Sequence, residues 1–403
     1  MKIAGIISEY NPIHNGHVHH IAETRRLLGA DTAIVCAMSG NFVQRGELAV
    51  FSKHARAEAA VLCGADLVVE LPLPSVLSSA ALFALGGVAL LNALGVITHL
   101  SFGSEAGDVA PLAEVAEGLL RPEMDGLIQK ELMLGVSYAV ARQRAAYRLF
   151  GEKACLLETP NNILGIEYIK ALKTLGASML PVTVRRLGAA HDSPGNESAS
   201  ALRAQMRAGK EIWPFIPEEA GRLYRAEIAA RRGPVFMAGI ETALLARLRM
   251  LKPDDFAALP DASEGLERRL MRAALTAPTL EALYGMTKTK RYALSRLRRM
   301  VMCAALGLTA SESRAMPCFA RVLALNKTGM AVLHHIKETS SLPVITKPAS
   351  AKGLNGPALS LFRKEAAATD FYVLACPGAE NRSGGQEWMR SPRIVGAMNR
   401  LHP

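Results

Sequence analysis

Short apolar runs alternate with amphipathic segments along the first half of the chain. Such runs are typical of buried strands, and the segments of helical periodicity between them are typical of covering helices. The predicted strands are residues 2–10, 31–38, 65–72, 97–103 and 178–186, and the first two predicted helices are residues 17–29 and 52–64. This alternation predicts a doubly wound α/β fold, with a parallel sheet covered on both faces. In such sheets ligands bind at the carboxyl ends of the strands.

Residues 71–103 contain no Asp, Glu, Lys or Arg, and this stretch is long enough to cross a bilayer. Two prolines, the Gly86–Gly87 pair, Asn92 and Gly95 interrupt it, which favours several shorter buried elements. We expect the end of a strand, a buried helix at about 75–94 and a buried strand at about 96–102.

The pattern changes twice further along the chain. Residues 109–150 are helical in pattern and interrupt the alternation, so we interpret them as a helical insertion. After residue 213, helices rich in Ala, Leu and Arg dominate as far as about residue 308, and a mixed stretch then predicts a small terminal α/β piece. We therefore expect a catalytic domain at 1–213 and a mainly helical, basic domain at 214–403. Within the second domain, the polar, glycine-rich segment 377–392 is predicted to be mobile.

The composition indicates a cellular compartment and a class of binding partner. The 403 residues carry a formal net charge of +11, which favours an anionic partner such as nucleic acid, nucleotide or an acidic membrane surface, although solubility alone would also explain it. The six cysteines form no CxxC pair and no zinc-ligand spacing, so we expect free thiols in a reducing compartment. The apolar part of the N-terminus is too short for a signal peptide, and a cytoplasmic protein is expected.

Candidate chemistry appears where the first strand meets the first helix, in the segment EYNPIHNGHVHH. Gly16 lets the backbone approach a ligand, and the helix N-terminus offers unpaired N–H groups to an anion. His14 and His17 flank this glycine and can donate hydrogen bonds to phosphate oxygens in a phosphoryl-transfer transition state. A metal site formed by His14, His17 and His20 stays open, although no HExxH or Cys partner is visible, and so does a set of histidines without function.

A second candidate element follows the last predicted strand of the first half. Ser198 and Ser200 are suitable helix N-caps, and Arg203 lies one turn into the same helix. The segment resembles the S-S-T-x-x-R element of small adenylyltransferases, in which a helix N-terminus and an arginine hold the β and γ phosphates. An ordinary capped helix is the alternative.

Two kinds of resemblance support a nucleotide site. His-Asn-Gly-His resembles the HxGH signature of the nucleotidyltransferase superfamily, which has a Rossmann-like fold and also contains the class I aminoacyl-tRNA synthetases. Longer segments resemble one family within it, the bacterial tRNA(Met) cytidine acetate ligases. These segments are residues 38–72, 98–108, 159–172, 184–192, 288–299 and 342–348.

The family resemblance implies a reaction. Such an enzyme uses ATP to activate acetate as acetyl-adenylate and passes the acetyl group to N4 of the wobble cytidine, position 34, of elongator tRNA(Met), which gives N4-acetylcytidine. The implied partners are ATP, acetate and elongator tRNA(Met), with no membrane and no protein partner. Mg²⁺ is compatible with the reaction, but no carboxylate cluster marks a metal site.

The resemblance also implies which residues bind the nucleotide, with His14 and His17 as the catalytic pair. The implied ATP-binding residues are Ile7, Ser8, Glu9, Tyr10, Asn11, Pro12, Ile13, His14, Asn15, Gly16, His17, His20, Gly103, Asn161, Arg186, Ser200 and Arg203. Several have simpler alternatives: Gly103 as a turn residue, Asn161 as a helix cap and Arg186 as a surface ion pair. Arg185 should face away from the site, because neighbouring residues of a strand alternate.

The sequence also departs from the family pattern in places. Ala190 stands where an aromatic residue is expected, and the Ser-Ala-Ser-Ala stretch at 198–201 differs slightly from the usual form. Neither change removes a charged phosphate ligand, so they leave only the fine shape of the site open.

The predicted RNA surface rests on charge. Six basic residues are expected to crowd one helix with Tyr292 among them, and they are Lys288, Lys290, Arg291, Arg296, Arg298 and Arg299. Such cations would bind phosphates, and an aromatic ring could stack on an unpaired base. A solvated basic helix is the alternative. For the whole chain, a small-molecule adenylyltransferase acting on a mononucleotide and a non-catalytic RNA-binding protein remain the competing functions.

Overall fold

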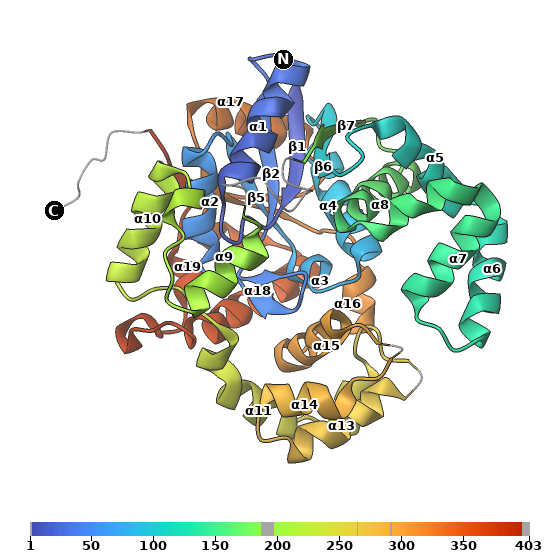
Figure 1. The fold of residues 1–403 in the computed structure, drawn as a ribbon. Coiled ribbons are helices and arrows are strands. Elements are labelled where there is room, and N and C mark those ends of the chain that lie inside the picture. The colour runs from blue at the N-terminus through green and yellow to red at the C-terminus, as the bar shows by residue number, and fades with distance from the viewer. Residues whose placement is uncertain (1, 187–196, 264, 291, 397–403) are drawn as a thin grey trace.

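The computed structural model describes residues 2–186, 197–263, 265–290 and 292–396, and a central sheet organises them (Figure 1). Its strands follow the order β10-β8-β5-β2-β1-β6-β7, with β9 beside β8. The strands are β1 (Ile3–Ser8), β2 (Ala33–Ser39), β5 (Leu67–Leu71), β6 (His99–Ser104), β7 (Leu180–Arg185), β8 (Ala320–Leu325), β9 (Val344–Ile345) and β10 (Arg393–Ile394). The five strands predicted from the first half of the chain are confirmed.

The order of the parallel strands creates a switch point between β1 and β6. From β1 the chain moves to β2 and then to β5 on one side, and it returns to β6 and β7 on the other. Because the connections diverge there, the topology predicts a crevice at the carboxyl ends of β1 and β6, where ligands of such sheets bind. The doubly wound fold predicted from the sequence is therefore confirmed.

Helices cover both faces of the sheet because side chains from both sides of each strand are apolar. Ala4 and Ile6 of β1 pack toward one face, and Ile3 of the same strand packs toward the other. The first face carries α1 (Asn15–Leu28), α2 (Lys53–Leu62), α9 (Ala199–Arg207) and α10 (Glu218–Ala229). The second face carries α4 (Ala80–Ala93), α8 (Pro160–Thr174) and α17 (Lys327–Thr339). Two apolar cores result, one on each face.

The uncharged stretch 71–103 forms several buried elements rather than one long helix. It contains the short α3 (Leu73–Val76), then α4, then most of β6. Ser79 separates the two helices, because its hydroxyl accepts a hydrogen bond from the N–H of Leu82 (3.4 Å) and so begins a new helix. Among the described residues, no helix is long and apolar enough to span a membrane.

Two helical regions flank the sheet. Residues 109–150 form α5 (Val109–Leu119), α6 (Pro122–Met133) and α7 (Tyr138–Phe150), which η1 (Gly151–Glu158) connects to α8. The second region has its own apolar core and follows η2 (Trp213–Phe215), α10 and η3 (Met237–Ile240). Its helices are α11 (Glu241–Arg249), α12 (Pro253–Ala257), α13 (Leu266–Thr276), α14 (Leu280–Thr287), α15 (Leu294–Leu306) and α16 (Ala310–Arg314).

The terminal α/β piece is present, and its strands extend the main sheet. β8 lies antiparallel to β5, and β9 and β10 lie parallel to β8. The intervening elements are α17, η4 (Pro348–Gly353), α18 (Gly356–Val373), η5 (Ala379–Asn381) and α19 (Gln386–Met389).

The predicted mobility of segment 377–392 is wrong, because Glu387 within it is almost fully buried. One oxygen of this carboxylate lies 2.7 Å from Nζ of Lys53, which also contacts both oxygens of Glu70 at 2.8 Å. Arg321 of β8 forms a further ion pair with Glu387.

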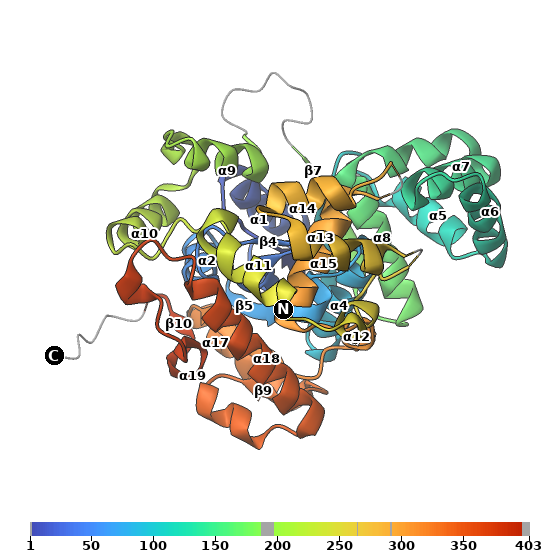
Figure 2. The same ribbon diagram turned by 90° about the horizontal axis from the view of Figure 1, so that it is seen from below.

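A small hairpin connects the sheet to the second helical region. It consists of β3 (Phe42–Val43) and β4 (Glu47–Leu48) and follows the carboxyl end of β2. At Gly46, a Cβ atom would lie only 2.5 Å from backbone atoms of Arg298 and Arg299, so the hairpin packs closely on α15. Glu47 adds an ion pair to Arg298 (2.5 Å). The helices α11–α15 therefore adjoin the edge of the sheet where the ligand crevice opens (Figures 1 and 2).

Candidate active site and basic surface

His14 and His17 cap the first helix reciprocally. His14 is the N-cap residue of α1, and its Nδ1 accepts a hydrogen bond from the N–H of Gly16 (3.1 Å). Nδ1 of His17 in turn accepts from the N–H of His14 (3.3 Å). Because Nδ1 is an acceptor in both rings, the neutral tautomer of each carries its proton on Nε2. The cap therefore leaves two Nε2–H groups as donors beside the helix N-terminus.

Both imidazoles are held neutral. Burial lowers the pKa of His14 to about 4, with a smaller effect of the Arg186 charge. Burial lowers the pKa of His17 as well, and the charges on His14 and Arg186 act in the same direction. The ring centroids lie 3.8 Å apart, so a proton on one ring disfavours a proton on the other. At neutral pH the pair offers hydrogen bonds without a full positive charge.

Gly16 is needed here for a reason that the sequence did not indicate. A Cβ atom at this position would lie 3.0 Å from Cε1 and 3.1 Å from Nδ1 of His14, so a side chain would press on the capping ring. Tyr10 supports the other ring, with its ring centroid 5.0 Å from that of His17 in an edge-on arrangement. The geometry of the pair therefore depends on its neighbours in the same loop.

Arg186 is held beside the site by a relay of hydrogen bonds that involves two other segments. Its Nη1 donates to Oδ1 of Asn161 (3.0 Å), and Nδ2 of Asn161 donates to Glu105 (2.6 Å). Glu105 follows β6 directly and also accepts from the N–H of Asn162 (2.8 Å), so it caps the start of α8. At Gly103 a Cβ atom would lie 3.3 Å from Cγ of Arg186, which explains why a glycine suits this position.

Sequence reasoning missed Glu105, although an acidic residue directly after a strand end was a usable signal. Arg185 points elsewhere, as expected, and packs against Gly107. The segment 187–196, which contains Ala190, lies outside the described residues.

Arg203 fastens α9 to the loop after β1. Its Nη1 donates to the carbonyl oxygen of Asn11 (2.8 Å), and its Nη2 donates to the hydroxyl of Ser200 (3.1 Å). The prediction of Ser200 as an N-cap is wrong, because α9 already begins at Ala199 and its capping hydroxyl belongs to Ser198, which accepts from the N–H of Ala201 (3.2 Å). Ser200 is exposed in the first turn, beside the arginine.

Glu9 places a carboxylate at the same crevice. It follows the last residue of β1, and its Oε1 accepts from the N–H of Gln44 (2.7 Å) in the turn that connects β3 to β4. Burial raises the pKa of Glu9, while Gln44 and the charges of Arg203, Arg56 and Arg45 lower it. Like Glu105, Gln44 is a contact that the sequence did not reveal.

His20 lies one turn further along α1 than the capping pair. Its Nε2 lies 3.0 Å from the hydroxyl of Ser101, which in turn lies 2.7 Å from that of Thr24. Burial lowers the pKa of His20 to about 4, and the charge of Arg186 adds to this. The ring thus has a protein partner between α1 and β6. Within the described ranges, no group of three His, Cys, Asp or Glu side chains is arranged to hold a metal ion.

The other predicted nucleotide residues lie around this centre in several ways. Ile7 packs against Gly87 of α4, the N–H of Ile13 donates to the hydroxyl of Tyr224 (3.4 Å), and Asn15 donates to the carbonyl of Pro214 (3.4 Å). Pro12 is buried, and Ser8 ends β1. These residues shape the loop, and the histidines, Glu9 and Arg186 carry its polar chemistry.

Comparisons with known proteins agree with this geometry. A family model described as HIGH Nucleotidyl Transferase matches residues 1–387. The tRNA(Met) cytidine acetate ligase of Acetivibrio thermocellus is 35% identical over 98% of this chain and 100% of its own. The ligase of the same name from Caldanaerobacter subterraneus is 36% identical over 93% of this chain and 96% of its own. The crystal structure of Thermotoga maritima TmcAL bound with alpha-thio ATP has a TM-score of 0.92 and 32% identity, over 98% of this chain and 99% of that one.

The chain belongs to the tRNA(Met) cytidine acetate ligase family of HIGH nucleotidyl transferases. The family predicted from the sequence is confirmed, and so is its fold. The His-Asn-Gly-His signature at 14–17 is the reciprocal cap described above, at the switch point of the sheet.

The basic residues predicted for RNA binding do not share one helix. α14 ends at Thr287 and α15 begins at Leu294, so Lys288 and Lys290 lie on the exposed connection between them. Arg291 lies outside the described residues. Tyr292 is 8% exposed within the helical core, so the prediction that its ring is available to stack on a base is wrong.

The arginines of α15 are held by groups of this chain. Arg298 pairs with Glu47 (2.5 Å), and Arg299 lies 3.5 Å from a carboxylate oxygen of Asp261. Nη2 of Arg296 donates to the carbonyl of Asp261 and to the hydroxyl of Ser263, both at 2.7 Å. Arg298 and Arg299 thus face carboxylates of this chain, whereas Arg296 donates to uncharged groups.

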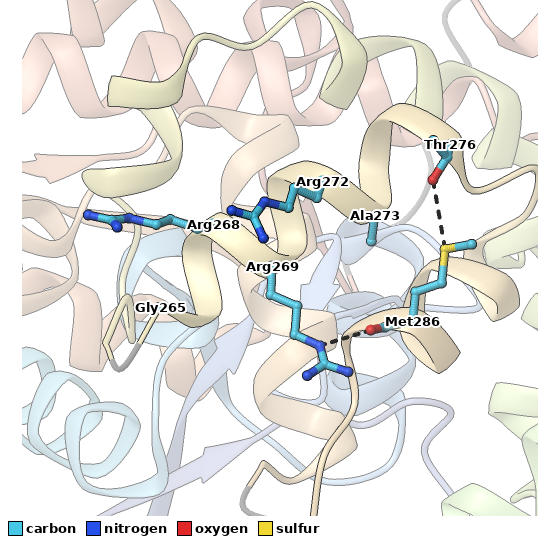
Figure 3. A pocket seen from close by; sticks show the side chains of 7 residues that line it. All are labelled: Gly265, Arg268, Arg269, Arg272, Ala273, Thr276 and Met286. Atoms are coloured by element: carbon cyan, nitrogen blue, oxygen red, sulfur yellow. Dashed lines mark hydrogen bonds between the residues drawn. The ribbon is translucent and has the colours of Figure 1, made fainter.

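A stronger basic surface lies on α13, where three arginines are exposed. Figure 3 shows Arg268, Arg269 and Arg272 extending from one stretch of this helix, with Arg269 turned toward Met286 of α14. Sequence reasoning missed them, although three arginines beside the apolar positions of an amphipathic helix were a usable signal.

Proposed function

We propose that this protein is an ATP-dependent ligase that activates acetate as acetyl-adenylate and acetylates N4 of the wobble cytidine, position 34, of elongator tRNA(Met). The observation that carries the proposal is the pair of Nε2–H donors held beside the N-terminus of α1 at the switch point of the sheet. The names of the relatives support tRNA(Met) as the RNA substrate, and the alpha-thio ATP bound by Thermotoga maritima TmcAL supports ATP as the nucleotide.

The residues of the crevice suit a nucleoside triphosphate. His14 and His17 present neutral donors, the adjoining helix N-terminus favours an anion, and Arg186 adds a positive charge. Among the described residues no metal-ligand cluster is present, so we propose no protein site for Mg²⁺. An ion that accompanies ATP would be bound by its phosphates.

In the first step, an acetate oxygen attacks the α-phosphorus of ATP. A bond forms between this oxygen and phosphorus, the bond to the bridging oxygen breaks, and pyrophosphate leaves. Donors on Nε2 of His14 and His17 stabilise the charge that develops on the α-phosphate oxygens. Arg186, and Arg203 near the start of α9, are suited to hold the departing phosphates.

In the second step, the exocyclic amine of cytidine attacks the acetyl carbon of the mixed anhydride. The carbon–nitrogen bond forms, AMP leaves with the bridging oxygen, and the amine loses a proton. Conjugation with the ring makes this amine a weak nucleophile, which is why the acid requires prior activation.

We also propose a functional division near residue 213. The catalytic part would be 1–213 with its insertion at 109–150, and the part that binds tRNA would be the basic helices that follow, while β8 to β10 complete the sheet. A tRNA substrate is consistent with a cytoplasmic enzyme, with ATP and acetate as its small-molecule partners.

The test is transfer of radiolabelled acetate to bulk tRNA, with and without ATP. We expect label in tRNA only with ATP and the unaltered protein, and none with a folded His17→Ala variant. If ATP binds but no label enters tRNA, the proposal that tRNA is the substrate is wrong, and a small-molecule adenylyltransferase becomes the better hypothesis. Absence of ATP binding would favour a non-catalytic RNA-binding protein.

A further inference from the structure

A groove lies between α13 and the connections around it. Two adjoining hollows of about 520 and 550 Å³ share Gly265 and Arg269 on their walls. One continues along α13 past Arg272, and the other extends to Lys290 on the α14–α15 connection. Gly135, in the turn between α6 and α7, closes the far side. The groove therefore lies between the helical insertion and the second helical region.

The walls of this groove are basic. Arg268, Arg269, Arg272 and Lys290 line it, and no acidic residue is among the described residues on its walls. Nε of Arg269 donates to the carbonyl of Met286 (2.9 Å), which holds that guanidinium at the surface. Arg268 is 3.9 Å from its neighbour Glu267, at the limit of an ion pair. For Arg272, the part of the chain that the structure describes offers no carboxylate within ion-pair distance.

The two residues before Gly135, on the far side of the groove, are apolar and exposed. Met133 and Leu134 directly precede Gly135 and are 87% and 69% exposed. A ligand that is anionic along one side and apolar along the other would match both walls. An RNA strand has this character, with phosphates on its backbone and the faces of its bases available for apolar contact.

We propose that the groove between α13 and the α6–α7 turn binds the sugar-phosphate backbone of the RNA substrate. This inference rests on the proposed function for the kind of RNA and goes beyond it in the surface. Arg268 and Arg272 lie one helical turn apart and bind successive phosphates, while residues 133–134 contact an adjacent base. The arginines of α15, by contrast, stay in their contacts with Glu47 and Asp261.

The position of the groove suits a substrate that must reach the nucleotide site. α15 lies in the same helical region as α13 and packs on the β3–β4 hairpin, whose turn contacts Glu9 through Gln44. A bound RNA would therefore rest on the helices that adjoin the ligand crevice, with its anticodon end free to enter from that side.

The test compares two triple variants of the full-length protein. The first is Arg268→Gln with Arg269→Gln and Arg272→Gln, and the control is Arg26→Gln with Arg222→Gln and Arg363→Gln, which removes the same charge from exposed sites on α1, α10 and α18. Affinity for an elongator tRNA(Met) transcript is measured between about 50 and 300 mM KCl, because phosphate contacts make binding depend on salt. Affinity for ATP reports whether the fold and the nucleotide site are intact.

We expect the α13 variant to lose at least about tenfold in tRNA affinity, with a log–log salt slope smaller by about 2 units, and to bind ATP within about twofold of the unaltered protein. The control should stay within about twofold for both ligands. Equal losses of tRNA affinity in the two variants, or no loss in either, would contradict RNA binding in the groove. A protein partner that binds there while tRNA binding is unchanged would also contradict it. If tRNA binds through the groove but is not acetylated, the proposed function is wrong, and the proposal that RNA binds in the groove is retained.

Discussion

At the scale of single residues, one ring does two tasks in this site. Nδ1 of His17 accepts the N–H of His14 and so begins α1, and we propose that its Nε2 donates to the nucleotide. Substitutions that imitate one nitrogen at a time can separate these tasks, because the amide of Asn resembles the position of Nδ1 and the amide of Gln resembles that of Nε2.

We expect His17→Asn to keep the helix cap and to lose the donor. Its adenylation rate should fall by about a hundredfold, as with removal of one oxyanion donor, while the free energy of unfolding changes by less than about 1 kcal/mol. His17→Gln should retain more activity and lose about 1 kcal/mol of stability. Acetate-dependent ATP–pyrophosphate exchange and urea unfolding measure the two quantities, and identical behaviour of the variants would argue against separate tasks.

The depressed pKa values of the site histidines predict a dependence of stability on pH. The pKa of His20 is about 4 in the folded protein and near 6.5 when unfolded, so the unfolded chain takes up a proton in this window and the native state does not. The free energy of unfolding should therefore fall as the pH drops from about 6.5 to 5, by up to about 1.4 kcal/mol per pH unit for each such histidine.

Urea unfolding at several pH values tests this, with His20→Gln as the comparison. Gln retains a hydrogen bond to Ser101 but does not titrate, so its stability should decline less steeply over the same window. Parallel curves for the two proteins would mean that His20 is not held neutral.

At the scale of elements, the start of α8 determines where Arg186 lies. Glu105 accepts hydrogen bonds from the first turn of α8 and from the side chain of Asn161, and Asn161 holds Arg186. A contact that caps a helix and also orients Arg186, which we propose binds phosphate, couples the stability of the helix to the shape of the site.

Two substitutions separate these effects. Glu105→Ala removes the cap and the anchor, so we expect a loss of about 1–2 kcal/mol in unfolding free energy together with weaker ATP binding. Asn161→Ala removes only the link to Arg186, so ATP binding should weaken by up to about tenfold with stability nearly unchanged. Titration calorimetry and thermal unfolding provide the measurements. Normal ATP affinity in both variants would show that Arg186 does not depend on this relay.

At the scale of the whole molecule, segments near the end of the chain complete the sheet that the first half of the chain forms. β8 and β10 extend the sheet beyond β5, and the buried carboxylate of Glu387 meets Lys53 and Arg321. The charges of Lys53 and Arg321 hold the pKa of Glu387 at about 2 despite its burial.

Removal of this carboxylate should therefore destabilise the folded protein. We expect Glu387→Ala to lower the free energy of unfolding by about 3–5 kcal/mol, because two buried cations lose a partner. Glu380→Ala is the matched control, since its carboxylate is exposed and lies 4.0 Å from Arg231, and it should change stability by less than about 1 kcal/mol. Urea unfolding of both variants at neutral pH measures this. A small effect at Glu387 would mean that Glu70 alone neutralises the two cations.

The sequence by itself determined the parts of this protein that local patterns control. Apolar runs and helical periodicity predicted the five parallel strands, and the helix predicted from residue 52 begins there because the hydroxyl of Ser52 caps the backbone. His14, Gly16 and His17 were found because a strand, a glycine and a helix start lie within a few residues. These features depend on near neighbours, so their physical causes are present in the sequence.

Only the tertiary structure decided which distant groups meet. The relay from Glu105 to Arg186 joins three segments, and the contacts of Arg298 and Arg299 with Glu47 and Asp261 take up charges that the sequence assigned to RNA. The antiparallel place of β8 beside β5 and the burial of Glu387 also depend on how distant segments pack. Charge and hydrogen bonding act over a few ångströms in space, whatever the separation along the chain, so sequence patterns alone do not reveal them.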